Sequence, residues 1–340
     1  MSHDRTSASV KAGRILQKGV WTLRPLDTLL TPFFPRKGKE DPYGLLVLLA
    51  PPRSGSTLTY QLLRSGIRGT YLSNLQNLLY ANPLLGQFLQ GPKCGNSISA
   101  FRSSGGFVPG ICGESEGLRF WKYWLGQGLE EQDELIPPQR ARGLERAVRK
   151  INTKRAGPFI TGFLGHVFSI DALQQIFPKV RFIHLKRDLL SNAASLYRYA
   201  PDRWRSTRPM GYGELLEHTR EEQVVEHILR THRTILRKRK ENPDAFVEVG
   251  YEKLCRDPVE TLRNIGADLE EKGIPLALKQ LDTLPSHFEE RKASPDDPAN
   301  KGLREAIEKR VGELNEDEKH FFRSILSKSH PEDHHDKSNL

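Results

Sequence analysis

Cysteine is scarce in this chain, with only three among 340 residues: Cys94, Cys112 and Cys255. They are odd in number, far apart and without the paired spacing of a metal site. The sequence therefore predicts neither a disulfide framework nor a zinc site. Unpaired cysteines are typical of a reducing compartment, so we expect a cytoplasmic protein.

Long apolar runs are also missing. The longest, Leu45–Ala50, is far shorter than the roughly 20 residues that cross a bilayer, and it fits a buried strand. The N-terminal residues lack the apolar core of a signal peptide. Between Ile15 and Pro35, apolar residues alternate with charges. We expect a packed helix there, with an amphipathic helix in peripheral contact with a membrane as the alternative.

Acidic residues are outnumbered, since 52 Lys and Arg face 42 Asp and Glu and give a net charge of +10. This balance favours an anionic partner: a nucleotide, an acidic glycan, a nucleic acid or an anionic membrane. The densest basic run, Leu236–Lys240, ends a predicted helix, where cations are favoured anyway. We therefore expect no nucleic-acid partner.

Short apolar runs alternate with helical patterns along the chain. The predicted strands are Leu45–Leu49, Pro158–Thr161, Val180–Leu185 and Ala245–Val249. Uniformly apolar strands separated by helices predict an α/β fold, in which a doubly wound parallel sheet of about four to five strands is flanked by helices. We expect an N-terminal extension at 1–40, a domain at 41–326 with a helical insertion at about 80–155, and a disordered tail at 327–340.

The segment Pro52–Thr57 follows the first strand and opens a helix, where backbone N–H groups and the helix dipole favour an anion. Gly55 allows close backbone approach, Ser56 and Thr57 offer hydroxyl groups, and Arg53 adds a charged donor. The lysine of the G-x-x-x-x-G-K-[ST] pattern is absent, which disfavours an ATPase or kinase. The segment predicts a P-loop-type anion site, with a simple capped helix start as the alternative.

A second candidate phosphate contact follows a later strand. Arg187 comes two residues after the predicted strand Val180–Leu185, at the carboxyl end of the sheet where ligands of such folds collect, and Ser195 follows eight residues on. A guanidinium forms a fork on phosphate that a lysine does not. The alternative is a local salt bridge between Arg187 and Asp188.

At these two motifs the chain resembles the superfamily of sulfotransferases that use 3′-phosphoadenosine 5′-phosphosulfate (PAPS), in its bacterial branch. Further similar segments are Ser73–Leu75, Phe101–Trp121 and Tyr251–Leu262, and the resemblance covers Leu45–Leu269. It implies an enzyme that transfers a sulfuryl group to a hydroxyl acceptor, without a metal, and leaves 3′-phosphoadenosine 5′-phosphate (PAP). The implied contacts to the 5′-phosphosulfate are Arg53, Ser54, Gly55, Ser56 and Thr57, and those to the 3′-phosphate are Arg187 and Ser195.

Such a transfer needs a general base at the acceptor and a cation at the leaving phosphate, the latter supplied by Arg53. Two candidate bases are Glu116, where the bacterial branch has its glutamate, and His166, at the spacing of the histidine base in cytosolic members. Glu114 is a third and weaker choice. A glutamate in the first turn of a helix and a packed histidine are the structural alternatives.

The region Tyr80–Thr153 would form much of the acceptor wall, and its aromatic and basic residues suit a carbohydrate or glycoconjugate. In this superfamily a C-terminal loop closes over the nucleotide; Arg291–Lys292 or Lys301–Gly302 could supply it. The lysine that many members carry near Thr161–Gly165 is absent. A noncatalytic protein that binds nucleotides or polyanions, and a P-loop phosphotransferase, therefore stay open as alternatives.

Overall fold

A computed structural model describes residues 20–33, 44–91, 94, 101–103, 106–126, 130, 136–152, 157–199, 207–274, 276–279 and 281–326. The predicted C-terminal tail, and most of the predicted N-terminal extension, lie outside the described residues.

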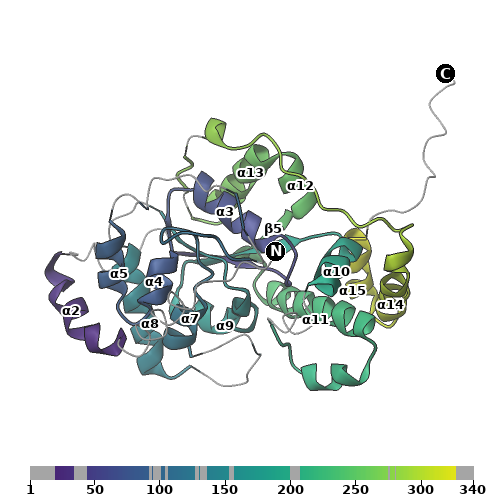
Figure 1. The fold of residues 1–340 in the computed structure, drawn as a ribbon, viewed down its shortest axis with the longest axis horizontal. Helices are drawn as coiled ribbons and strands as arrows, with labels where there is room; N and C mark the ends of the chain where they lie inside the picture. Colours follow the sequence, from purple (N-terminus) through teal and green to yellow (C-terminus); the bar gives the residue numbers. More distant parts are fainter. Residues whose placement is uncertain are drawn as a thin grey trace, which may run out of the picture.

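Five parallel strands form one sheet in the order β2–β3–β1–β4–β5 (Figure 1). They are β1 (Leu45–Leu49), β2 (Thr70–Tyr71), β3 (Phe159–Thr161), β4 (Val180–Lys186) and β5 (Phe246–Gly250). The central strand β1 pairs in parallel with both β3 and β4. The predicted P-loop-type doubly wound parallel sheet is confirmed, with β2 as a strand that the sequence did not reveal.

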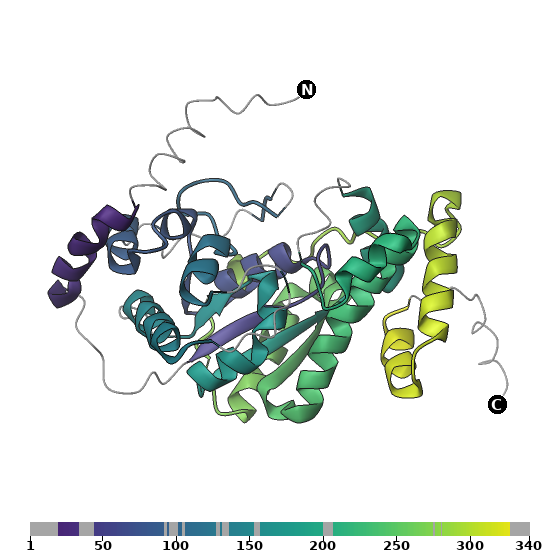
Figure 2. The same ribbon diagram turned by 90° about the horizontal axis from the view of Figure 1, so that it is seen from below.

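Helices cover both faces of the sheet, which explains why β1 is apolar at every position. Leu46 and Leu48 face one apolar core, formed with α3 (Ser56–Gly66), α12 (Tyr251–Arg256) and α13 (Pro258–Glu271). Leu45, Val47 and Leu49 face the other, formed with α7 (Leu118–Trp124), α8 (Pro138–Ile151), α9 (Ile170–Ile176) and one residue of α11 (Arg220–Glu241). A third core joins α10 (Leu189–Arg198), α11, α14 (Lys301–Gly312) and α15 (Glu316–Ser324), which lie together at one side of the molecule (Figure 2).

The helices have the following bounds: α2 (Arg24–Leu29), α3 (Ser56–Gly66), α4 (Asn74–Leu78), α5 (Pro83–Gln90), α7 (Leu118–Trp124), α8 (Pro138–Ile151), α9 (Ile170–Ile176), α10 (Leu189–Arg198), α11 (Arg220–Glu241), α12 (Tyr251–Arg256), α13 (Pro258–Glu271), α14 (Lys301–Gly312) and α15 (Glu316–Ser324). Short 3₁₀ turns include η1 (Val20–Leu23), η2 (Thr31–Phe33), η4 (Leu164–Phe168) and η6 (Tyr212–Glu217). Within the described ranges, none of these helices combines the length and apolar character needed to span a bilayer.

Cys94 and Cys112 form a disulfide, so the prediction of unpaired cysteines is wrong. The two Cα atoms lie 5.1 Å apart although 18 positions separate them in the sequence. Tyr71, in β2, places its hydroxyl 2.6 Å from the Cys94 carbonyl oxygen and 3.2 Å from that of Cys112. Tertiary contacts of a strand that the sequence did not reveal therefore close this loop. We expected a reducing compartment because the cysteines looked unpaired, and this disulfide removes that reason. Cys255 stays free and buried.

The connections place a functional site at the carboxyl ends of β1 and β4. After β1 the chain passes through α3 toward the β2 edge, whereas after β4 it passes through α10 and α11 to β5 at the opposite edge. The chain thus leaves these adjacent strands in opposite directions, and such a switch point is where open α/β sheets bind ligands.

Candidate active site

The loop after β1 has a tightly constrained backbone. Arg53 and Gly55 both adopt positive φ, at 65° and 93°. Ser54 is fully buried and donates its hydroxyl hydrogen to the Pro51 carbonyl at 2.8 Å, so its side chain braces the loop from inside. A Cβ atom on Gly55 would lie 2.2 Å from the Tyr251 ring, which leaves room only for glycine.

Helix α3 begins directly after this loop, so its first N–H groups point toward the loop. Ser56 and Thr57 occupy the first turn; Ser56 is buried and Thr57 is partly exposed. The predicted phosphate loop thus has the backbone arrangement that holds an anion at a helix N-terminus.

Arg187 crosses from the end of β4 to this loop. Its Nη1 donates to the Arg53 carbonyl oxygen at 2.7 Å, and its Nη2 donates to the carbonyl oxygen of Arg291. The guanidinium carbon lies 4.6 Å from the centroid of the Tyr251 ring. The two nucleotide motifs of the sequence, 134 positions apart, therefore meet in space.

Helix α10 presents a polar side to the same loop. The carboxylate of Asp188 accepts the N–H of Ser191 at 2.8 Å, which caps the helix. Asn192 donates through Nδ2 to the Pro52 carbonyl at 2.8 Å. Ser195 lies three residues beyond Asn192, and thus on the same side of the helix. Among the described residues, the partly buried Ser195 hydroxyl has no hydrogen-bond partner.

Three arginines concentrate positive charge at the loop. Burial lowers the pKa of Arg53, and the positive charges of Arg187 and Arg291 lower it further, although Tyr199 acts in the opposite direction. The Nε atoms of Arg53 and Arg187 are buried and have no hydrogen-bond partner within the described ranges. None of the three arginines forms an ion pair with a described carboxylate. An anion bound at this place would accept hydrogen bonds from the unpaired Nε–H groups and would balance the positive charge of the arginines.

Glu116 lies between the end of β2 and the start of α7. Ser115 fixes this segment by donating its N–H to the Leu72 carbonyl at 2.8 Å. A Cβ atom on Gly106 would lie 3.7 Å from Thr57 Oγ1 and 3.8 Å from Glu116 Oε1, so the carboxylate and the first turn after the phosphate loop lie close to the same glycine. Burial raises the pKa of the Glu116 carboxyl from 4.5 to about 7.

Glu114 has a different environment although it is only two residues away. Its Oε1 lies 3.4 Å from Arg64 Nε, and both side chains are buried. Arg64 also donates to the Tyr71 hydroxyl at 3.0 Å. Glu114 is therefore half of a buried ion pair, whereas Glu116 forms no ion pair with a described cation.

His166 packs against the apolar core that contains Trp121 and Phe163. It is fully buried, and its ring centroid lies 4.3 Å from that of Trp121 and 5.1 Å from that of Phe163. Its Nε2 lies 3.2 Å from Thr161 Oγ1. Burial lowers the pKa of His166 to about 3, so the ring is neutral near pH 7, and it has no exposed surface for an acceptor to approach.

The model of the sulfotransferase family matches residues 46–272, which is more than half of the chain and includes both nucleotide motifs. The chain belongs to the sulfotransferase family. It is accordingly an enzyme of this family. A search of curated protein sequences finds no match.

The chain is also similar to solved structures of sulfotransferases, and the first of those named here supports the fold. Sulfotransferase STF9 from Mycobacterium avium is 18% identical, with a TM-score of 0.50 over 81% of this chain and 76% of that chain. The sulfotransferase domain of the Synechococcus PCC 7002 olefin synthase is also 18% identical, with a TM-score of 0.39 over 83% of this chain and 99% of that chain. Sulfotransferase STF1 from Mycobacterium tuberculosis H37Rv is 14% identical, with a TM-score of 0.41 over 87% of this chain and 82% of that chain. At these identities the likeness concerns the fold alone.

Several residues of the site were not predicted from the sequence of the sulfotransferase. Tyr251 was noted only as part of a similar segment, and Asn192 not at all, because their roles depend on packing against the loop. Of the two segments considered for a C-terminal closure, Arg291 contacts Arg187, while Lys301 begins α14. A stretch without helix or strand, 284–297, carries Arg291 to the site.

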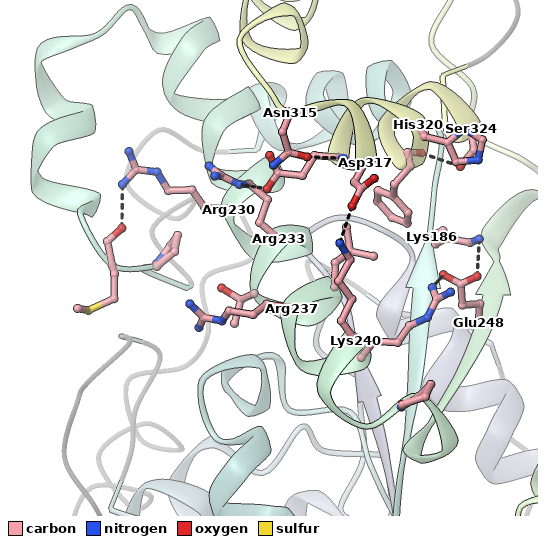
Figure 3. Close-up of a pocket in the computed structure, with 18 residues that line it drawn as sticks. Lys186, Arg230, Arg233, Arg237, Lys240, Glu248, Asn315, Asp317, His320 and Ser324 are labelled. Atoms are coloured by element: carbon pink, nitrogen blue, oxygen red, sulfur yellow. Dashed lines mark hydrogen bonds and ion pairs between the residues drawn. The ribbon is translucent and has the colours of Figure 1, made fainter.

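The sulfotransferase also has a cavity of about 1230 Å³ between α11 and α15 (Figure 3). It is lined by cations of α11, but Arg233 pairs with Glu318 at 2.7 Å and Lys240 pairs with Asp317 at 2.8 Å. None of the predicted site residues lines it. The basic run of the sequence thus contributes to a mixed-charge groove apart from the phosphate loop.

Proposed function

We propose that the chain transfers a sulfuryl group from PAPS to a hydroxyl of a carbohydrate or glycoconjugate by in-line displacement, with Glu116 as general base. The observation that carries the proposal is the meeting of three parts at one place. The phosphate loop, Arg187 and the Glu116 carboxylate come from separate segments, and the desolvated carboxylate and the Thr57 hydroxyl both lie close to Gly106.

The residues present fit a nucleotide with two phosphate sites. The buried Nε atoms of Arg53 and Arg187 lack partners, and the Ser195 hydroxyl is similarly available. In the proposal, Arg53, Ser54, Gly55, Ser56 and Thr57 hold the 5′-phosphosulfate, with Ser54 contributing its N–H because its hydroxyl is engaged within the loop. Arg187 and Ser195 hold the 3′-phosphate. When bound, PAPS supplies an activated sulfuryl group.

The proposed roles follow from charge and acidity. Glu116 removes the proton of the acceptor hydroxyl while the oxygen–sulfur bond forms, and its raised pKa suits a base near neutrality. As the bond between sulfur and the phosphate oxygen breaks, Arg53 and the N–H groups of α3 stabilise the charge that develops on the phosphate. Three arginines supply this charge, so the proposal includes no metal.

The acceptor wall is proposed to come from the segment around Glu116. Phe107 directly follows Gly106 and is 50% exposed, while Arg119, three residues after Glu116, is exposed. An exposed aromatic ring and an exposed cation on this segment suit a sugar that also carries acidic groups. These features support a carbohydrate or glycoconjugate acceptor.

The test combines PAP binding with sulfuryl transfer. Calorimetry would measure PAP affinity, and a panel of glycans incubated with ³⁵S-labelled PAPS would report transfer. We expect Glu116→Gln to bind PAP normally but to transfer poorly, and Arg187→Ala to lose both activities. The matched control Glu130→Gln changes an exposed glutamate that pairs with Arg208. A wild-type chain that binds PAP but labels no acceptor would refute transfer, and one without affinity for PAP would refute the nucleotide site.

A further inference from the structure

Helix α2 and the following turn η2 present apolar side chains to solvent. Leu26, Leu29 and Phe33 follow the spacing i, i+3, i+7 and are 46%, 67% and 71% exposed. Residues with this spacing lie on one side of a helical segment. Such a stripe normally packs on the core of a globular protein, so its outward position is the reverse of ordinary amphipathicity.

The polar side of α2 fixes this orientation. Asp27 is 7% exposed, and its Oδ1 accepts the N–H groups of Leu84 at 2.6 Å and Leu85 at 3.0 Å, at the start of α5. Its Oδ2 lies 3.4 Å from Lys150 Nζ. The buried carboxylate thus anchors α2 to α5 and α8 and leaves the apolar stripe outside.

Further apolar side chains are exposed on α5, which packs against α2. On α5, Phe88 is 59% and Leu89 is 56% exposed. Of the nine large apolar residues that are exposed in the described part of the chain, eight lie between positions 26 and 118: Leu26, Leu29, Phe33, Phe88, Leu89, Phe107, Ile111 and Leu118. We call these eight the apolar end. Leu118 follows Glu116 by two residues, and the ninth residue, Met210, lines the groove beside α11.

The net charge of the N-terminal residues indicates which kind of partner binds the apolar end. Residues 1–40 contain eight Lys and Arg but three Asp and Glu, so their net charge of +5 is half of the chain's +10. A basic segment that includes an outward apolar helix combines the two signals that hold a protein on an anionic bilayer. We propose that the apolar end docks on the surface of an anionic lipid bilayer, with α2 lying in the interface.

A second copy of the chain fits this end less well. Figures 1 and 2 show α2 at one extremity of the molecule, where it protrudes beyond the other described helices of that side. The three exposed apolar side chains of α2 and η2 offer on the order of a few hundred Å², whereas a stable dimer buries roughly 800 Å² on each partner. A protruding helix can reach a flat surface without a complementary groove.

The test is cosedimentation of the full chain with vesicles. We expect binding to vesicles of phosphatidylcholine with about 30% phosphatidylglycerol, weak binding to phosphatidylcholine alone, and a decrease at high salt because the attraction is partly screened. The double variant Leu29→Glu and Phe33→Glu should partition at least about tenfold less, because two apolar contacts are lost and two negative charges are added.

The matched control is Met210→Glu, which adds a charge at an exposed apolar residue away from the apolar end and should bind as the wild type does. Circular dichroism and thermal unfolding establish that both variants are folded. Equal vesicle binding by the double variant and the wild type would overturn the proposal, as would no binding by the wild type. Light scattering that shows a dimer, broken by the double variant, would assign the apolar end to a second copy instead.

Discussion

Replacing Glu116 by Gln tests the candidate base through two independent readouts. The substitution keeps the size of the side chain but removes both the negative charge and the ability to take a proton. General-base catalysis contributes about 10²- to 10⁴-fold, so kcat should fall by that factor while PAP affinity stays unchanged. In the wild type, kcat should rise with pH up to about 7, since the base works only when deprotonated.

The same pKa predicts a change in stability with pH. Folding raises the pKa of Glu116 from 4.5 to about 7, so the folded protein holds this proton more tightly than the unfolded chain does. The contribution to stability is complete below pH 4.5 and is lost as pH rises through 7. A shift of this size corresponds to at most about 3 kcal/mol, and less because the carboxylate is partly exposed.

The measurement is chemical denaturation of wild type and Glu116→Gln between pH 4 and pH 8. The difference between the two proteins removes the contributions of the other carboxylates. Relative to wild type, the variant should become more stable as pH rises, by about 2 kcal/mol over this range. A pH-independent difference would show that burial does not perturb this carboxyl. Transfer within a few-fold of wild type would refute Glu116 as the base.

Three further predictions concern the scaffold of the site. Arg187→Ala removes two hydrogen bonds to loop carbonyls and one cation, so PAP affinity should fall about 100-fold, measured by calorimetry; an unchanged affinity would contradict the predicted role. Gly55→Ala places a methyl group 2.2 Å from the Tyr251 ring at positive φ and should cost about 3 kcal/mol of unfolding free energy, whereas Gly213→Ala, in open space, should cost little. Replacing Cys94 and Cys112 by Ser should lower the free energy of unfolding by about 3 kcal/mol, measured by denaturant titration, and a reductant should not lower the stability of this variant further.

The sequence predicted the long strands well because their burial leaves a clear signal. Leu45–Leu49 is the only run of five consecutive aliphatic residues before the loop, and it forms β1 with the predicted bounds. Strand β4 extends the prediction by Lys186, and β5 begins at Phe246, one residue later than expected. By contrast, β2 comprises only Thr70 and Tyr71, too few residues for any alternation to appear.

Other features depend on contacts that spacing does not encode. Cys94 and Cys112 looked unpaired because the loop that joins them is closed by Tyr71 from a strand too short to predict. The two candidate bases were equally plausible in the sequence. Their environments differ, because His166 packs against Trp121 inside the core whereas the Glu116 carboxylate and Thr57 lie close to the same glycine, Gly106.

The loop lacks the lysine of the G-x-x-x-x-G-K-[ST] pattern, and in the structure arginines from three separate segments surround it instead. Where a lysine is part of the loop pattern, the cation and the phosphate-binding backbone belong to one segment, and the sequence of that segment is enough to predict the site. Here the cations are Arg53 in the loop, Arg187 after β4 and Arg291 from the C-terminal stretch, and they meet only when the sheet is formed. The positive charges of Arg187 and Arg291 lower the pKa of Arg53, and the Nε–H groups of Arg53 and Arg187 are buried without a hydrogen-bond partner among the described residues. Ligand binding should therefore stabilise the fold, because an anion that pairs with all three arginines removes the repulsion between their positive charges.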